Sequence, residues 1–197
     1  MGGMKHIWFF GFGFSAQALA RRLDRRHWRI SGTSRSAEGV QRIAGQGFEG
    51  HLFDPLKTIP DDVTHVVSSI PPDASGDPVL RRFATALAVP RDWVAYLSTT
   101  GVYGDHGGAW IDENTPLTPN TERGSRRLHA EQAWTGINPQ TQHFRLAGIY
   151  GPGRNQLLSI LDGTAKRVIK PGQFFSRIHV EDIAGILDAS IARPLSG

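Results

Sequence analysis

Two kinds of hydrophobic pattern alternate along this 197-residue chain. Short runs of consecutive apolar residues are typical of buried parallel strands, and between them apolar residues recur at helical spacing. The runs predict strands over residues 7–10, 28–33, 48–53, 63–70, 93–97 and 143–147. Helices are predicted after residue 13 and over 37–44, 78–89, 122–134, 157–161 and 180–192. This order predicts an α/β fold with a doubly wound parallel sheet.

The first apolar run leads directly into a glycine-rich turn, GFGFSA, at residues 11–16. Gly11 permits a sharp turn, Gly13 lets a diphosphate approach bare backbone, and Ala16 lets a helix pack close to the strand. The order predicts a dinucleotide site at the helix start, formed by Gly11, Phe12, Gly13, Phe14, Ser15 and Ala16. We expect both phenyl rings to point into the packing and leave the amides free. The alternatives are an ordinary glycine turn, or a protein that binds no nucleotide because these rings fill the phosphate approach.

The end of the second predicted strand indicates which nucleotide would bind. In such units an acid at this position binds the ribose 2′-hydroxyl, whereas an arginine accommodates a 2′-phosphate. This chain has Ser34 and Arg35 there and no carboxylate. The sequence therefore favours NADP(H) over NAD(H), because a guanidinium offers donors matched to phosphate oxygens. The alternative is a surface arginine without a ligand.

Further candidates follow the third and fourth predicted strands. Asp54 comes after the third strand, and Ser69, Ile70 and Pro71 end the fourth. Ligands bind at the carboxyl ends of strands in parallel sheets, so these residues are predicted to contact the cofactor. Asp and Pro are also favoured in ordinary turns, which is the alternative.

Composition narrows the classes of function. The net charge is +4, but the arginines are scattered, so we expect solvated helix faces rather than a nucleic-acid interface. The chain has no cysteine, which excludes thiolate metal sites and a Cys nucleophile, and no metal site is predicted. No apolar run is long enough for a membrane span or a signal peptide. We therefore expect one soluble, cytoplasmic protein that does not associate with a membrane.

Four motifs occur together in this chain: GFGFSA, STTGVYG at residues 98–104, RLAGIYGPG at 145–153 and RIHVEDIA at 177–184. In this order they resemble the extended short-chain dehydrogenases/reductases of the NAD(P)-dependent epimerase/dehydratase type. The spacing of the first two glycines looks like the atypical branch that includes the YeeZ-like proteins. The resemblance implies that residues 1–197 are an NAD(P)-binding Rossmann domain, with residues 148–197 the start of a reduced substrate-binding part. It also implies a possible homodimer.

The resemblance also implies a catalytic set of Ser or Thr, Tyr, and Lys four residues after the Tyr. The Ser/Thr role falls on Thr99, whose alternative role is a hydrogen bond to backbone at a strand end. Alignment on Glu131 places Arg123 at the Tyr position and Arg127 at the Lys position. Arginine does not release a proton at physiological pH, so the usual proton transfer is in doubt.

The spacing of Arg123, Arg127 and Glu131 puts all three on one helical face. One hypothesis is that both arginines hold an anion, Arg127 on the cofactor and Arg123 on the substrate; the alternative is a surface Arg–Glu pair. Tyr103 is a candidate substrate contact, and Tyr103, His106 and His129 are candidate proton donors.

Two classes of function follow. The first is an NADP(H)-dependent oxidoreductase or epimerase/dehydratase acting on a nucleotide sugar or small carbonyl compound. The second is a non-catalytic NADP(H)-binding redox sensor or regulatory module. Both have a small-molecule partner, as substrate or effector, and sequence alone does not separate them.

Overall fold

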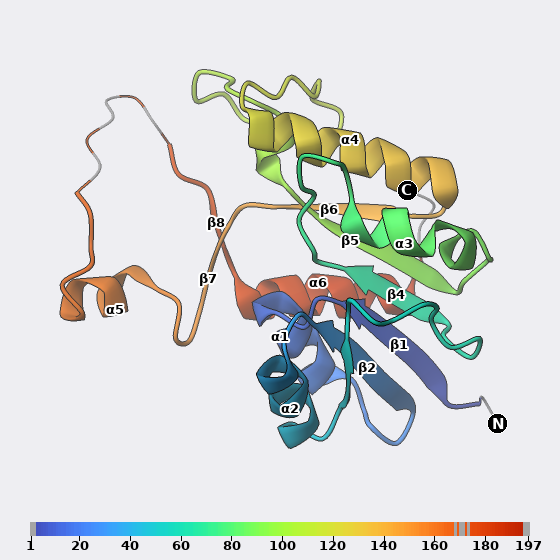
Figure 1. The fold of residues 1–197 in the computed structure, drawn as a ribbon. Coiled ribbons are helices and arrows are strands. Elements are labelled where there is room, and N and C mark those ends of the chain that lie inside the picture. The colour runs from blue at the N-terminus through green and yellow to red at the C-terminus, as the bar shows by residue number, and fades with distance from the viewer. Residues whose placement is uncertain (1–2, 168, 170–171, 173, 195–197) are drawn as a thin grey trace.

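A single parallel sheet organises the fold in the computed structural model, which describes residues 3–167, 169, 172 and 174–194. The strand order is β3-β2-β1-β4-β5-β6 (Figure 1). The strands are β1 (Lys5–Phe10), β2 (Trp28–Ser34), β3 (Glu49–Leu52), β4 (His65–Ser68), β5 (Trp93–Thr99) and β6 (Gln142–Leu146). The order reverses beside β1, between β2 and β4, which is where doubly wound sheets bind ligands.

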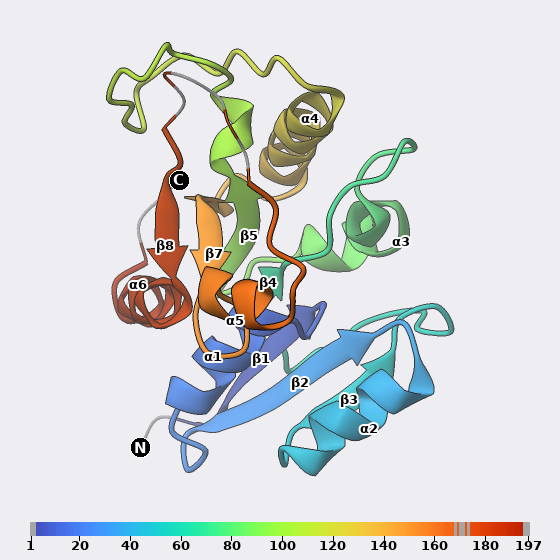
Figure 2. The same ribbon diagram turned by 90° about the vertical axis from the view of Figure 1, so that its left-hand side faces the viewer.

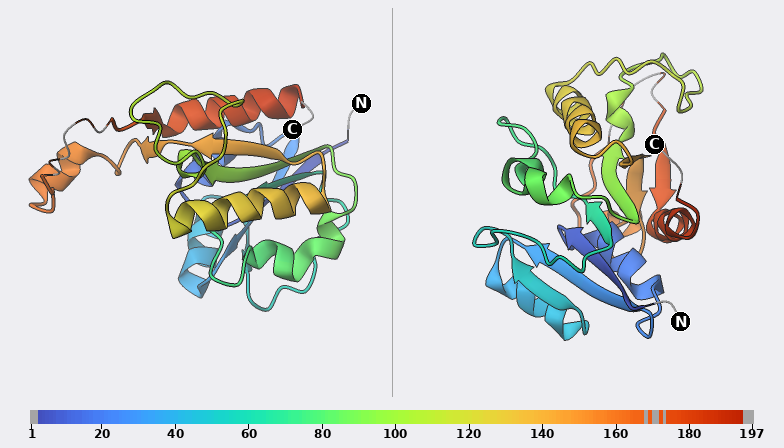
Figure 3. Two further views of the ribbon diagram at one scale, coloured as in Figure 1. Left: turned by 90° about the horizontal axis from the view of Figure 1, so that it is seen from above. Right: turned by 90° about the vertical axis from the view of Figure 1, so that its right-hand side faces the viewer.

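Helices cover both faces of the sheet, as Figure 3 shows in its right-hand view. They are α1 (Phe14–Arg22), α2 (Ala37–Gly45), α3 (Pro78–Leu87), α4 (Glu122–Ile137) and α6 (Val180–Ala192). One hydrophobic cluster joins α1 and α6 to the sheet and includes Ile43 of α2. The other joins α3 and α4 to the opposite face. The doubly wound architecture predicted from the sequence is confirmed.

The central strand β1 shows why its last four residues, Ile7 to Phe10, are all apolar. Ile7 and Phe9 belong to the first cluster, whereas Trp8 and Phe10 belong to the second, and all four are fully buried. Successive side chains of a strand point to opposite faces, so a strand covered on both sides needs apolar residues at every position. This strand therefore holds the following glycine turn against a rigid core.

The segment after β6 leaves the sheet and extends away from the body, as Figures 1 and 3 show. It contains β7 (Gly148–Tyr150), the short helix α5 (Gln156–Leu161) and β8 (Arg177–His179), and β7 pairs with β8 in parallel. None of the strands predicted from the sequence includes β7 or β8. The partner strand lies far along the chain, so local propensity gives no signal for the pairing. None of the described helices is long and apolar enough to cross a lipid bilayer.

Candidate functional site

A pocket of about 1160 Å³ opens at the carboxyl ends of the first four strands. Most of the predicted cofactor residues line it: Gly11, Phe12, Gly13, Ser34, Arg35, Asp54, Ser69, Ile70 and Pro71. Phe14, Ser15, Ala16 and Arg127 are not part of this lining. The fold thus brings together residues from four separate loops, as expected for the switch point of a doubly wound sheet.

The two glycines of the turn have different structural roles. Gly11 has a φ of +82°, and an added Cβ would lie 2.9 Å from Ser69 Oγ, so both conformation and space require glycine. Gly13 is exposed, and an added Cβ would meet nothing within 4 Å. The absence of a side chain at Gly13 therefore serves no internal packing and leaves bare backbone facing the pocket.

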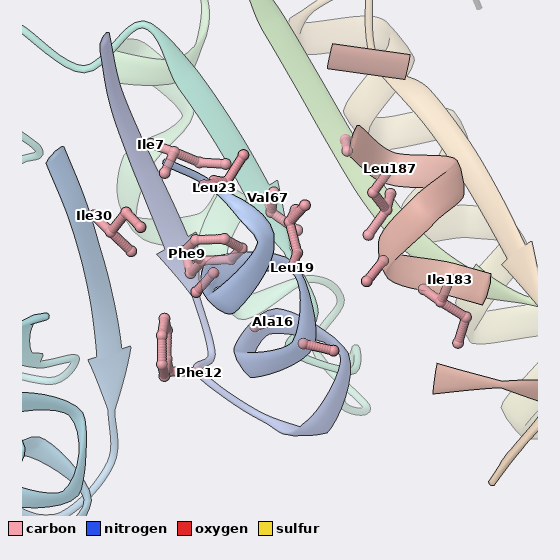
Figure 4. Close-up of a cluster of buried hydrophobic side chains, with 14 of the residues drawn as sticks. Ile7, Phe9, Phe12, Ala16, Leu19, Leu23, Ile30, Val67, Ile183 and Leu187 are labelled. Carbon is pink, nitrogen blue, oxygen red and sulfur yellow. The ribbon is translucent and has the colours of Figure 1, made fainter. Parts of the chain in front are cut away.

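Phe12 does not block this backbone, because its ring is buried in the core. The ring lies 5.4 Å from Phe9, centroid to centroid, and its position depends on Gly32, where a Cβ would lie 2.3 Å from Phe12 Cδ2. Figure 4 shows Phe12 among the core side chains near Phe9. The Phe12 amide, however, donates to the Thr33 carbonyl at 3.1 Å. The expectation that this amide is free for a ligand is therefore wrong.

The start of α1 is arranged to receive an anion. Gly13 is the N-cap residue, so no side chain caps the helix, and its first turn contains no acidic residue. Ser15 and Ala16 are buried and fix the helix against the sheet, while Phe14 packs partly buried on the first cluster. The partial positive charge of an uncapped helix start favours negative groups.

The polar residues that line the pocket differ in whether they already form hydrogen bonds or ion pairs within the protein. Arg35 is exposed, and within the described chain no hydrogen bond or ion pair holds its guanidinium. Ser69 Oγ donates to the Gly11 carbonyl at 2.9 Å, which makes it a support for the glycine turn. The exposed carboxylate of Asp54 lies 3.6 Å from Arg82. Arg35 is thus an available cation at the end of β2.

The second candidate region, at the carboxyl end of β5, is built differently. Thr99 is partly buried, and its Oγ1 accepts a hydrogen bond of 3.2 Å from the Gly101 amide, capping the short 3-10 helix Thr100–Val102. This is the backbone role considered as the alternative for a strand-end threonine. Thr99 does not line the pocket described above.

Arg127, predicted to bind the cofactor, makes contacts inside the protein and does not line the pocket described above. It is only 8% exposed, and its Nη1 donates to the Leu97 carbonyl at 2.9 Å and to the Tyr96 hydroxyl at 3.2 Å. Arg123 is exposed on the same helix and free of any such engagement among the described residues. The two arginines of the predicted anion site thus lie in different surroundings, because Arg127 is buried and Arg123 is exposed to solvent.

The alternative of a surface Arg–Glu pair is also wrong for this face of α4. Glu131 is 3% exposed and accepts hydrogen bonds from Ser98 and from Arg145, whose Nη2 lies 2.9 Å from the carboxylate. The exposed pair four residues apart on α4 is Arg126 with Glu122. Helical spacing identified the face correctly but could not show that the sheet covers it.

Tyr103 belongs to this same buried network, which sequence reasoning missed. Tyr103, predicted to contact the substrate, is 5% exposed, and its hydroxyl accepts a hydrogen bond from Arg145 Nη1 at 3.0 Å. Burial acts to lower the pKa of Arg145, but its bonds to Glu131 and Tyr103 outweigh this and raise it. One feature of the sequence could have indicated this network: Arg145 is a charged residue inside a strand that was expected to be buried.

The remaining candidate proton donors lie outside any assembled catalytic set. His106 Nε2 lies 3.0 Å from the Tyr103 carbonyl and holds the loop, and His129 is exposed on α4. His143, on β6, faces Thr135 with 2.8 Å between Nε2 and Oγ1, and burial lowers its pKa. Around Glu131 the polar side chains thus pair with one another.

Comparison with known proteins adds independent evidence. No family model matches the chain. Protein YeeZ of Escherichia coli K12 is 28% identical, over 98% of this chain and 76% of its own length. A functionally unknown conserved protein from Silicibacter pomeroyi is 48% identical, with a TM-score of 0.91 over 98% of this chain and 70% of that one. A structure from Methylobacillus flagellatus, assigned as an NAD-dependent epimerase/dehydratase, is 28% identical, with a TM-score of 0.71 over 98% and 71%.

The fold and pocket define a nucleotide-binding α/β protein of the Rossmann type. A human epimerase family protein solved with NADPH shares this fold at 17% identity, with a TM-score of 0.65 over 96% of this chain and 70% of that one. Together with the motifs, the likeness to Protein YeeZ and to the Methylobacillus flagellatus structure supports a relationship to the extended short-chain dehydrogenase/reductase and epimerase/dehydratase proteins.

Proposed function

We propose that this protein binds NADP(H) in the pocket at the end of β1 and β2, and that it acts as an epimerase/dehydratase-like or oxidoreductase-like enzyme. The substrate class is a nucleotide sugar or a small carbonyl compound. The observation that carries the proposal is the exposed, bare backbone of Gly13 beside an uncapped helix start. A backbone position that packs against nothing in its own chain is suited to the close approach of a diphosphate.

The preference for NADP(H) is supported by the end of β2. Arg35 lines the pocket without an ion pair in the described chain, and Ser34 beside it carries no charge. A 2′-hydroxyl would be bound by a carboxylate at this position, whereas a guanidinium matches the oxygens of a 2′-phosphate. The neighbouring residues therefore suit the phosphorylated ribose better than the free one.

The chain's own residues would divide the work as follows. The first-turn amides of α1 hold the diphosphate, and Arg35 holds the 2′-phosphate. A bound nicotinamide supplies hydride chemistry. The Thr99 hydroxyl orients a substrate oxygen, exposed Arg123 attracts an anionic group of the substrate, and the projecting segment from β7 to β8 begins the substrate-binding part.

One observation favours a second candidate, a non-catalytic NADP(H)-binding sensor. Arg127, at the lysine position, is bonded to Leu97 and Tyr96, and Tyr103 is bonded to Arg145. Arg123, at the tyrosine position, is exposed but does not release a proton at physiological pH. A protein that retained the cofactor pocket while its proton-transfer residues became structural would show this arrangement.

Thermal-shift measurements with NADP⁺, NADPH, NAD⁺ and NADH test nucleotide binding, which both candidate functions require. A ligand at one hundred times its dissociation constant should stabilise the protein by about 2.7 kcal/mol. Consumption of NADPH with a panel of carbonyl compounds then separates them. Turnover that Thr99→Ala abolishes supports the enzyme, whereas binding without turnover supports the sensor. No stabilisation by any of the four nucleotides would contradict the proposal.

A further inference from the structure

Four arginines line the pocket, and the two on the β4–α3 side are already paired. Arg81 forms two hydrogen bonds of 2.7 Å with the Asp73 carboxylate. Arg82 donates to the Phe53 carbonyl at 2.8 Å and lies 3.6 Å from Asp54. On this side of the pocket the positive charges are balanced by the protein itself.

The other two arginines, on the β2–α2 side, are not balanced in this way. Arg35 follows β2 and Arg42 lies on α2, and both side chains are exposed at the pocket. Within the described chain, no hydrogen bond or ion pair holds either guanidinium. The nearest acid along α2 is Glu38, one turn before Arg42; bonds to backbone and Ser36, together with the Arg42 charge, lower its pKa. Glu38 is exposed and does not line the pocket.

Close packing holds α2 beside the ends of β2 and β3, as Figure 2 shows. A Cβ added at Gly39 would lie 1.8 Å from Ser34 Oγ, and one added at Gly50 would lie 2.7 Å from the Val40 carbonyl oxygen. Both glycines thus let the helix approach the strands more closely than any other residue would allow. This approach brings Arg42 to the same pocket wall as Arg35.

We propose that Arg42 and Arg35 together form a binding site for a phosphate monoester, and that Arg42 is a second residue that selects the 2′-phosphorylated nucleotide. This inference rests on the proposed function, because the adenosine half of the cofactor would carry that phosphate. A phosphate monoester has a charge of about −1.5 to −2 at pH 7, which a single guanidinium does not neutralise. Two uncommitted guanidinium groups match that charge.

Calorimetric titration of the whole chain with 2′,5′-ADP and with 5′-AMP tests the site without nicotinamide chemistry. We expect the wild type to bind 2′,5′-ADP more tightly. Arg42→Ala and Arg35→Ala should each weaken 2′,5′-ADP binding about tenfold or more, the usual effect of losing a charge-assisted hydrogen bond. Binding of 5′-AMP should change less than about twofold, since it lacks the 2′-phosphate.

Arg21→Ala is the matched control, since it removes the same charge from an exposed site on α1 outside the pocket lining. It should leave both affinities unchanged. If Arg42→Ala lowers 2′,5′-ADP binding no more than Arg21→Ala does, while Arg35→Ala still lowers it, the two-arginine site is overturned and the proposed function stands. If the wild type gives no heat with NADP⁺ or NAD⁺, the proposed function itself fails.

Discussion

Charged side chains have opposite roles in two regions at the carboxyl edge of the sheet. At the β1–β2 end, Arg35 and Arg42 face an open pocket without partners in the described chain. At the β5–α4 end, Arg145 is held by Glu131 and Tyr103, and Arg127 by backbone. Removing one partner of a buried ion pair destabilises the fold, whereas charges left exposed in a concave site remain available to a ligand.

The comparison explains why arginine at the positions of the expected tyrosine and lysine need not abolish nucleotide binding. Arg127, which the motif alignment places at the lysine position, makes interior contacts, and its guanidinium lies 5.5 Å from the centroid of the Tyr96 ring. The glycine turn does not depend on that contact, because its own support comes from Thr33 and Ser69. We therefore expect nucleotide binding to depend on the β1–β2 end and stability to depend on the β5–α4 end, and the following changes test this difference.

The largest expected effect is on stability, from Glu131→Ala. Removal of the carboxylate leaves the partly buried Arg145 without its counter-charge, which should cost about 4 kcal/mol of unfolding free energy. Urea denaturation measures this. Glu122→Ala, which removes the exposed partner of Arg126 on the same helix, should cost less than about 0.5 kcal/mol. Equal costs for the two variants would show that the network is not a stabilising unit.

Arg127→Ala should cost about 2 kcal/mol of unfolding free energy, because the Leu97 carbonyl and the Tyr96 hydroxyl lose a buried donor. The affinity for NADP⁺ should remain within about twofold of the wild type. Arg123→Ala, an exposed change on the same helix, should alter stability by less than about 0.5 kcal/mol. A loss of nucleotide affinity in Arg127→Ala without a loss of stability would reverse the assignment.

Gly13→Ala should have the opposite effect to Arg127→Ala: it should weaken nucleotide binding more than it lowers stability. The added methyl group meets nothing in the protein, so stability should fall by at most about 1 kcal/mol, the cost of a poorer N-cap. The same methyl occupies the approach of the diphosphate, and NADP⁺ affinity should fall about tenfold, or about 1.4 kcal/mol. Gly136→Ala, also in open space but on α4, should leave the affinity unchanged. Full affinity in Gly13→Ala would place the diphosphate elsewhere.

The smallest expected effect is a pH dependence of stability from His143. Burial lowers its pKa from the usual 6.5, so the unfolded chain takes up a proton at this residue before the folded protein does. Its contribution to stability is therefore retained above about pH 6.5 and is lost progressively as the pH falls below that value. Urea denaturation at pH 7.5 and 5.5 should show a smaller difference for His143→Gln than for the wild type. The same difference in both proteins would contradict this assignment.

The sequence predicted the cofactor end of the molecule better than the β5–α4 end, and the reason is physical. A glycine turn between a buried strand and a helix is a local signal, and Arg35 follows from the place where β2 ends. The role of Arg127, by contrast, depends on its hydrogen bonds to Leu97 and Tyr96 of β5, which lie 30 and 31 residues earlier in the chain. Helical spacing places Arg127 and Glu131 on one face but does not show which face the sheet covers.

Two further features also escaped sequence reasoning because they depend on distant contacts. The Phe12 amide is taken by the Thr33 carbonyl, a bond set by how the two strands end side by side. The β7–β8 pairing joins Ile149 to Ile178 across the whole projecting segment. Neither contact follows from propensity or periodicity, whereas the bounds of α6, which rest on a local apolar pattern, were predicted correctly at Val180–Ala192.

A crystal structure of the protein grown with NADPH tests the central claim most directly. We expect the diphosphate over the backbone of Gly13 and the 2′-phosphate between Arg35 and Arg42, with Arg127 still bonded to the Leu97 carbonyl. A cofactor bound at the β5–α4 end through Arg127, or a Gly13 pocket closed by the protein's own side chains, would contradict it.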